Sequence, residues 1–188
     1  MNNQCISTTL TRLCESTTLA VIVAFLCFSL TQADSPQLPD GSPTQISVPA
    51  IGLNQEIRPV GIIPVVVNGT TYFTWNVLDS YVGWHNLSAR PGQVGNTVLS
   101  GHSDAKARVF QKLHQVNIGD EIAVVSGGQS RHYMVTNKLL LQEKGASIET
   151  RIENARWIAP TNDERLTLVT CARPGATHRL IVVAYPVE

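Results

Sequence analysis

Charged residues are scarce in this sequence. Asp, Glu, Lys and Arg make up 15% of its 188 residues, and 14 basic residues balance 14 acidic ones, so the formal net charge is zero. A chain without a basic excess is a poor candidate for nucleic-acid binding. The sequence also lacks a glycine-rich phosphate-binding loop and a paired-cysteine zinc motif. Its apolar fraction of 43% is nevertheless high enough to form a core.

The N-terminus differs from the rest of the chain, because residues 16–33 carry no charge and are mostly apolar. A helix of that length spans about 27 Å, just short of the hydrocarbon core of a bilayer. We favour a single-pass membrane anchor, and the alternative is a cleaved signal peptide with Thr31-Gln32-Ala33 as its cleavage site. The predicted organisation is a tail (1–15), this segment (16–33), a linker (34–43) and one exported domain (44–188).

Cysteine is rare outside that N-terminal region. Cys5, Cys14 and Cys27 lie in or before the apolar segment, which leaves Cys171 as the only thiol of the predicted exported domain. Cys171 therefore has no partner in that domain for a disulfide. A catalytic thiol and a small buried core residue both fit this count.

Short β-prone runs separated by turns follow the linker and predict one all-β barrel or sandwich of about eight strands. Asn68-Gly69 between two of these runs is a strong hairpin signal. Val109–Val116 has apolar residues at helical spacing, and a helical turn is expected near Ile148–Asn154. The expected strands are Ile46–Ala50, Gln55–Val60, Ile62–Val67, Thr70–Thr74, Asn96–Ser100, Glu121–Val125, Arg131–Leu141, Arg165–Cys171 and Arg179–Val187.

The last two of these strands can be placed geometrically. If residues 172–178 close an antiparallel hairpin, Cys171 faces Arg179, and the pairs 169/181 and 167/183 follow. Directly opposed residues have Cβ atoms about 5 Å apart and share one face of the sheet. An arginine side chain is long enough to extend beyond the sulfur, to where a substrate carbonyl would lie.

Cys171, Arg179 and a histidine would form a site for cysteine acyl transfer. The thiol attacks a carbonyl, the guanidinium stabilises the oxyanion, and the histidine protonates the leaving amine. We favour His102 as this histidine because it ends an expected strand directly after a glycine. Structural or surface roles are expected for the other four, His85, His114, His132 and His178.

Two sequence blocks resemble the signature of sortases. One is TLVTC, residues 167–171, followed by HRLIVVA, which contains Arg179. The other is GNTVLSGHSDAKARVFQKLHQVNIGDEI, which resembles the histidine region of that family. The resemblance covers about residues 44–188 and implies an eight-stranded β-barrel with one or two short helices. It also implies that Cys171 is the nucleophile, His102 the acid/base and Arg179 the oxyanion-side arginine, with Thr170 helping to shape the peptide groove.

The activity implied by this resemblance is cleavage of an LPxTG-like sorting signal between Thr and Gly. The acyl group would pass through a thioacyl enzyme to an amine of a cell-wall precursor or a pilin lysine. The partners would be secreted proteins with a C-terminal sorting signal, and the domain would lie on the outer face of a bacterial membrane. The short connection between Cys171 and Arg179 and the lack of an extra domain resemble the small class D and class E branches.

No cofactor or metal is expected, although Asp104 and Glu143 leave calcium activation open. An L,D-transpeptidase-like enzyme is an alternative, because Cys171-Ala172-Arg173 fits the C-x-R ending of that family. Thr170 stands where that family places a glycine. A membrane-tethered binding barrel without chemistry is the alternative from another class.

Overall fold

A computed structural model describes residues 41–104, 107–172 and 177–187. The description below concerns residues 39–188, which form one compact unit of the chain. The predicted tail and anchor, residues 1–33, lie outside the described residues, as does most of the linker. Within the described part of the chain, no helix is long and apolar enough to cross a membrane.

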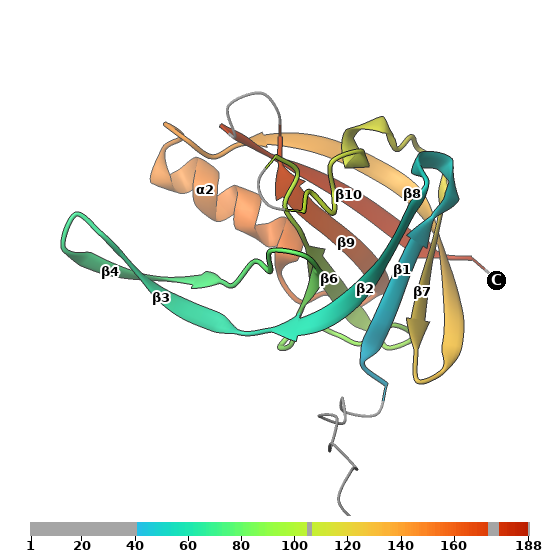
Figure 1. The fold of residues 1–188 in the computed structure, drawn as a ribbon. Helices are drawn as coiled ribbons and strands as arrows, with labels where there is room; N and C mark the ends of the chain where they lie inside the picture. The colour runs from blue at the N-terminus through green and yellow to red at the C-terminus, as the bar shows by residue number, and fades with distance from the viewer. Residues whose placement is uncertain (1–40, 105–106, 173–176, 188) are drawn as a thin grey trace, which may run out of the picture. The chain divides into compact units, whose positions relative to one another are not determined.

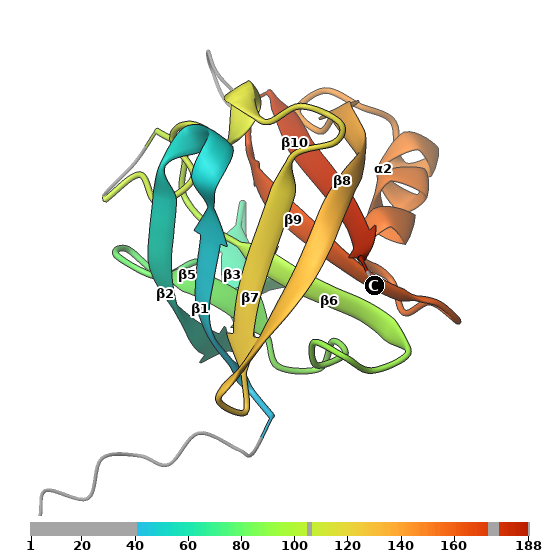
Figure 2. The same ribbon diagram turned by 90° about the vertical axis from the view of Figure 1, so that its right-hand side faces the viewer.

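Eight strands close into a barrel, which confirms the all-β prediction (Figures 1 and 2). Their order is β1-β2-β5-β6-β9-β10-β8-β7, and β7 pairs back onto β1. The pairs β2/β5 and β6/β9 are parallel, and the other neighbours are antiparallel. The bounds are β1 (Pro43–Val48), β2 (Leu53–Val60), β5 (Val82–His85), β6 (Gly95–Ser100), β7 (Glu121–Ser126), β8 (Gln129–Gln142), β9 (Glu164–Cys171) and β10 (His178–Pro186).

Strands β9 and β10 are buried on both faces along most of their length. Leu166, Leu168 and Val182 point into the barrel and belong to its hydrophobic core. Thr167 and Ile181, on the opposite face by alternation, are also buried. Two covered faces explain why these strands have continuous apolar runs instead of alternating apolar and polar residues.

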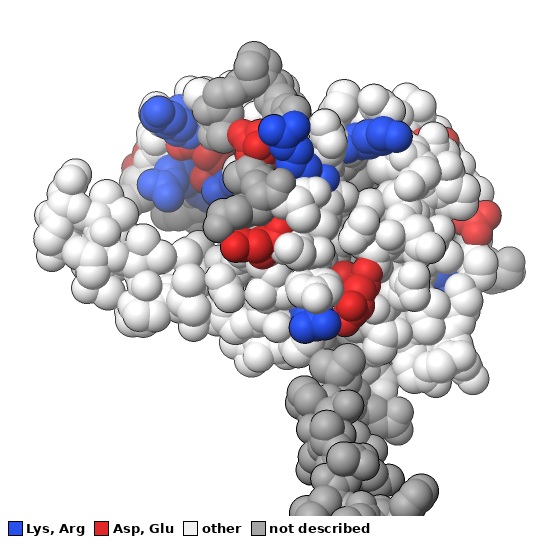
Figure 3. Space-filling view, viewed as in Figure 1, with Lys and Arg blue, Asp and Glu red and all other residues white. Residues whose placement is uncertain are grey.

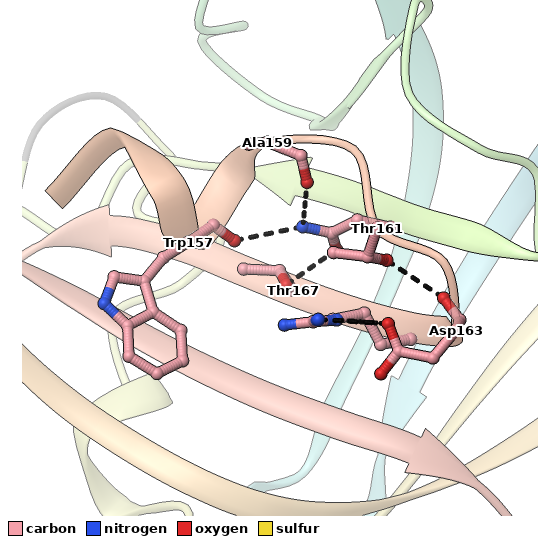
Figure 4. A network of polar contacts seen from close by, with 7 residues as sticks. Trp157, Ala159, Thr161, Asp163 and Thr167 are labelled. Atoms are coloured by element: carbon pink, nitrogen blue, oxygen red, sulfur yellow. Dashed lines mark hydrogen bonds and ion pairs between the residues drawn. The ribbon is translucent and has the colours of Figure 1, made fainter. Parts of the chain in front are cut away.

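The segment that follows α2 (Ile148–Ala155) is fastened to the outside of β6 by one amide side chain. The Asn96 Nδ2 group donates to the carbonyls of Trp157 and Ala159, at 3.0 and 3.1 Å. Its Oδ1 atom accepts from the Thr167 hydroxyl at 2.7 Å (Figure 4). Trp157 lies in the short 3-10 helix η4 (Arg156–Ile158), so these bonds hold the α2–η4 connection against the sheet.

The expected hairpin at Asn68-Gly69 forms, but it lies outside the barrel. Among the described residues, strands β3 (Ile62–Val67) and β4 (Thr70–Trp75) pair only with each other, and they project from the barrel wall (Figure 1). Asn68 and Gly69 both have positive φ, 50° and 77°, as a two-residue hairpin turn requires. The sequence predicted this hairpin correctly, but its assignment to the barrel was wrong.

The eighth barrel strand is instead β5, which the sequence prediction missed. It has only four residues, and all of them, including Gly83 and His85, are buried. A run that short, which is interrupted by glycine and covered on both faces, shows no alternation from which a strand could be predicted.

The helix predicted over Val109–Val116 is replaced by turns and the 3-10 helix η3 (Leu113–Gln115). The four apolar residues at helical spacing are indeed buried, but the backbone bonds to its surroundings: the Phe110 amide donates to the His102 carbonyl at 2.9 Å. Arg108, directly before this run, has a φ of 54°, and Val116 at its end is extended with a ψ of 139°, so the run does not continue as a helix at either end. The expected helical turn near residue 148 is confirmed as α2, which begins after the N-cap Ser147.

Candidate active site

The site forms where two parallel strands end at the same edge of the barrel. β6 and β9 are parallel neighbours with Ser100 opposite Val169. The chain leaving β6 therefore passes directly beside the last residues of β9. Two hydrogen bonds fix this arrangement: the Gly101 amide donates to the Val169 carbonyl at 3.2 Å, and the Thr170 hydroxyl donates to the Gly101 carbonyl at 2.7 Å.

Arg179 lies across the next strand pair from Cys171, in the register that the sequence predicts. The observed β9/β10 pairs are 171/179, 169/181 and 167/183. Nη1 of Arg179 donates to Sγ of Cys171 at 2.5 Å. The arginine is exposed and the cysteine is half-buried, so the thiol and its guanidinium partner both remain open to a substrate.

Ser103 is a site residue that the sequence analysis missed. Its buried hydroxyl donates to the backbone carbonyl of Cys171 at 2.6 Å. The bond fastens the loop that carries His102 to the end of the strand that carries the thiol. His102 itself is half-buried, directly between the residues bonded to β9. No local signal in the sequence indicates this role, because the acceptor is a backbone carbonyl 68 positions away.

A cavity of about 680 Å³ opens beside Cys171. Its walls come from the ends of β8, β9 and β10 and from the loop after His102, and they include Phe110, Leu139, Leu140, Thr170, Cys171 and Leu180. Most of these side chains are apolar, so the cavity suits an apolar part of a peptide more than a charged ligand. Thr170, expected to shape a peptide groove, lines this cavity while its hydroxyl stays bonded to Gly101.

Three of the other four histidines have roles apart from the thiol. His85 is buried, and its Nε2 atom lies 3.1 Å from the Ser100 hydroxyl. Burial lowers its pKa from 6.5 to about 4, so it stays neutral at physiological pH. His132 is exposed and pairs with Glu121 at 2.5 Å. His178 contacts the hydroxyl of its neighbour Thr177.

His114 is a competitor to His102 because it lines the cavity beside the thiol. It is exposed on η3, bonds to the Gln111 carbonyl at 3.0 Å, and lines the cavity. His102 differs because it follows β6, the parallel neighbour of β9, and β6 ends beside the strand end that carries Cys171. Backbone and side-chain bonds from both neighbours, Gly101 and Ser103, then hold it there.

The two acidic residues considered for calcium do not come together with others of their kind. Over residues 41–104, 107–172 and 177–187, no group of three or more His, Cys, Asp or Glu could hold a metal ion. Glu143 accepts from Asn154 at 3.2 Å and lies 3.8 Å from Arg151. Asp104 is exposed. Arg173, the arginine of the alternative C-x-R reading, lies outside the described residues.

Comparison with known proteins gives one consistent family. A family model described as a sortase domain matches residues 46–187. No curated protein matches the chain.

Similar solved structures include three sortases. Sortase C-1 from Actinomyces oris has a TM-score of 0.60 at 22% identity, over 90% of this chain and 84% of that one. A Clostridium perfringens sortase D5 transpeptidase has 0.59 at 20% identity, over 81% and 83%. Sortase A from Corynebacterium diphtheriae has 0.59 at 24% identity, over 88% and 69%. At these identities the likeness concerns the fold.

Proposed function

The chain belongs to the sortase family, and from that premise we propose that it is a cysteine transpeptidase. Its substrate would be an extended peptide with an LPxTG-like sorting signal, and its second substrate a primary amine. The observation that carries this proposal is the contact between Arg179 and the Cys171 sulfur, at the strand end where His102 also emerges. Family membership disfavours the L,D-transpeptidase alternative.

The first half-reaction is acyl transfer to the enzyme. Sγ of Cys171, as the thiolate, attacks the carbonyl carbon of the threonine in the sorting signal. The carbonyl oxygen becomes an oxyanion, which the Arg179 guanidinium stabilises with a fixed positive charge. The carbon–nitrogen bond then breaks, and the protonated His102 gives its proton to the leaving glycine amine. The products are a thioacyl enzyme and a free peptide amine.

The second half-reaction reverses these roles. The acceptor amine attacks the thioester carbonyl, and the neutral His102 takes the proton that this amine loses. The oxyanion collapses, the carbon–sulfur bond breaks, and the Cys171 thiolate is regenerated beside Arg179. The net reaction exchanges one amide for another, so no oxidant, reductant or cofactor is consumed.

We place the enzyme at the outer face of a bacterial membrane, held by residues 16–33 as a single-pass anchor. The substrates would be secreted proteins with a C-terminal sorting signal. The acceptor would be an amine of a peptidoglycan precursor or a pilin lysine. Thr170 would shape the peptide groove from the cavity beside Cys171. We propose that the enzyme belongs with the small class D and class E branches, and the short Cys171–Arg179 connection supports this proposal. We expect neither a metal nor another cofactor.

The decisive experiment uses the full chain in detergent micelles with a set of peptides of the form Leu-Pro-X-Thr-Gly and a glycine-based amine. Mass spectrometry should detect the wild-type enzyme with the mass of the N-terminal peptide fragment added, and hydroxylamine should remove that mass. Cys171→Ala should form no adduct and no transpeptidation product while retaining its circular dichroism spectrum. Cys27→Ala, a matched change at a cysteine outside the site, should behave as wild type.

Turnover by Cys171→Ala close to that of wild type would refute the cysteine mechanism. Labelling by a methanethiosulfonate reagent separates the remaining alternative. If Cys171 is reactive, the wild type should carry one label more than Cys171→Ala. That label should abolish turnover. A Cys171 that stays unlabelled in the folded protein would favour a binding barrel without chemistry.

A further inference from the structure

The β3–β4 hairpin is an uncharged, apolar projection with no role in the chemistry above. Residues 59–78, which contain the whole hairpin, include no Asp, Glu, Lys, Arg or His. Phe73 is 75% exposed and Val66 is 67% exposed. Figure 3 shows this projection as an unbroken uncharged surface, whereas charged side chains are scattered over the neighbouring face of the barrel.

Neither face of the hairpin carries a charge, and each has several apolar side chains. Directly paired residues share a face, so the register assigns each side chain to one of two sets. One face carries Ile62, Pro64, Val66, Thr71, Phe73 and Trp75, and the other carries Ile63, Val65, Val67, Thr70, Tyr72 and Thr74. All of these residues except Trp75 are exposed. A two-stranded hairpin is at best marginally stable in water, and exposed apolar area of this kind marks an interaction surface.

We propose that this hairpin inserts into the lipid–water interface of the membrane; the inference rests on the membrane location in the proposed function. Lipid covers both faces and the turn at once, which a flat protein surface does not. Valine, isoleucine and phenylalanine favour the acyl boundary, and Tyr72 and Trp75 are the aromatic types that gather at the interface. With no basic residue in the hairpin, binding should not depend on anionic lipid.

The unpaired edges of the hairpin limit how deep it can go. In the part of the chain that the structure describes, β3 and β4 pair only with each other, so each has one row of backbone groups without a strand partner. Such groups are too costly to place in hydrocarbon but remain hydrated at the interface. The hairpin should therefore rest at the level of the headgroups and the upper acyl chains.

The length of the tether is compatible with this position. Residues 34–42 separate the predicted anchor from Pro43, where β1 begins. Nine extended residues reach at most about 30 Å, which keeps the barrel close to the bilayer surface. Each hairpin strand has six residues and is about 20 Å long, a length that can bridge much of that separation.

A second copy of the chain is a weaker candidate than lipid for the partner that covers the hairpin. Pairing along the β3 edge would meet Pro64, which has no amide hydrogen to donate. A partner strand along either edge would also leave both apolar faces open to water. A partner sheet would cover only one of them.

The base of the hairpin is attached to the strands that lead to the active site. The Trp75 ring stacks on His85 with centroids 4.1 Å apart, and His85 contacts Ser100 at the end of β6. The hairpin is thus fixed to β5 and β6. Once inserted, it would hold the barrel at one orientation and the cavity beside Cys171 at one height above the bilayer.

The test places a tryptophan on the hairpin of the full chain and asks whether lipid reaches it. Phe73→Trp is the probe, and Ile118→Trp is the matched control, because Ile118 is 69% exposed in a loop away from the hairpin. Each variant is reconstituted into phosphatidylcholine vesicles with and without bromine on the acyl chains. After subtraction of the wild-type signal, brominated lipid should quench most of the emission of the tryptophan at 73 and little of that at 118.

A second change shows whether apolar contact causes the quenching. Val66→Asp combined with Phe73→Trp should lose that quenching, because a charged side chain opposes insertion. Val66→Thr, which retains β propensity, should retain most of it. Equal quenching at 73 and 118, or failure of the chain to associate with the vesicles, would overturn the inference. Cross-linked dimers through residue 73, without quenching, would assign the hairpin to a second copy instead.

Peptide turnover in detergent distinguishes this inference from the proposed function. The Val66 and Phe73 variants should keep wild-type turnover of a soluble peptide, since neither residue belongs to the site. Quenching without turnover in the wild type would leave the lipid contact standing and refute the transpeptidase. Turnover without quenching would refute the lipid contact and leave the transpeptidase standing.

Discussion

Because His85 is buried, the free energy of unfolding should depend on pH, and the size of this dependence can be calculated. His85 is 4% exposed, its Nε2 atom lies 3.1 Å from the Ser100 hydroxyl, and its ring stacks on Trp75. Burial lowers its pKa in the folded state to about 4, whereas the unfolded chain has the ordinary value of 6.5. Unfolding between these two values therefore takes up a proton, and lowering the pH favours the unfolded state.

The magnitude follows from the two pKa values. The contribution of His85 is fully present above pH 6.5, decreases as the pH falls from 6.5 to 4, and levels off below 4. The difference of about 2.5 pKa units corresponds to a maximum loss of about 3 kcal/mol. At pH 5, the expected loss relative to pH 7 is about 2 kcal/mol.

Urea unfolding of the wild type and of His85→Gln at pH 7 and pH 5 measures this contribution. Glutamine cannot titrate, but its amide can still bond to Ser100, so carboxylates contribute equally in both proteins and cancel in the comparison. The wild type should lose about 2 kcal/mol more than the variant between the two pH values. Equal losses, or an NMR titration of His85 centred near 6.5, would show that the ring is not held neutral by burial.

Four further outcomes follow from the site. Arg179→Ala should lower turnover about 10²–10³-fold, and Arg179→Lys should recover part of that loss. Arg173→Ala should raise the activation free energy by less than about 1 kcal/mol. A large loss at Arg173 with little loss at Arg179 would contradict the assigned roles. His102→Ala should lower turnover at least about 10²-fold, and an equal loss in His114→Ala would mean that the acid/base is misassigned. Ser103→Ala should cost about 1–3 kcal/mol in urea unfolding, and an unchanged midpoint would show that its bond to Cys171 adds nothing. EDTA should leave turnover unchanged, and restoration of lost activity by calcium would reveal a metal requirement.

The arrangement of Cys171 and Arg179 could be predicted because it depends on a local rule. In an antiparallel hairpin, the residue numbers of every directly opposed pair add to the same total, and side chains alternate between two faces. The observed pairing of 171 with 179 follows from that rule once residues 172–178 are taken as the connection. His102 was harder to place, because its approach to β9 depends on the parallel pairing of two strands that are far apart in sequence.

The errors in the fold prediction have the same origin. The β3–β4 hairpin was recognised from Asn68-Gly69, which is a local signal, but whether a hairpin joins a barrel depends on long-range pairing. β5 carries no local signal, and only its neighbours β2 and β6 make it a strand. Ser103 could not be assigned either, because its partner is a backbone carbonyl 68 positions away.

The topology explains how a projection as unusual as the β3–β4 hairpin can be carried without disturbing the site. Parallel strand pairs need crossover connections, and this barrel has two of them, between β2 and β5 and between β6 and β9. The first crossover contains the hairpin, and the second contains the His102 loop, β7, β8 and α2. The geometry of the candidate site depends on the ends of β6, β9 and β10, which the first crossover does not supply. The length and composition of the first crossover can therefore serve another purpose, provided that Trp75 still stacks on His85 at the base of the hairpin.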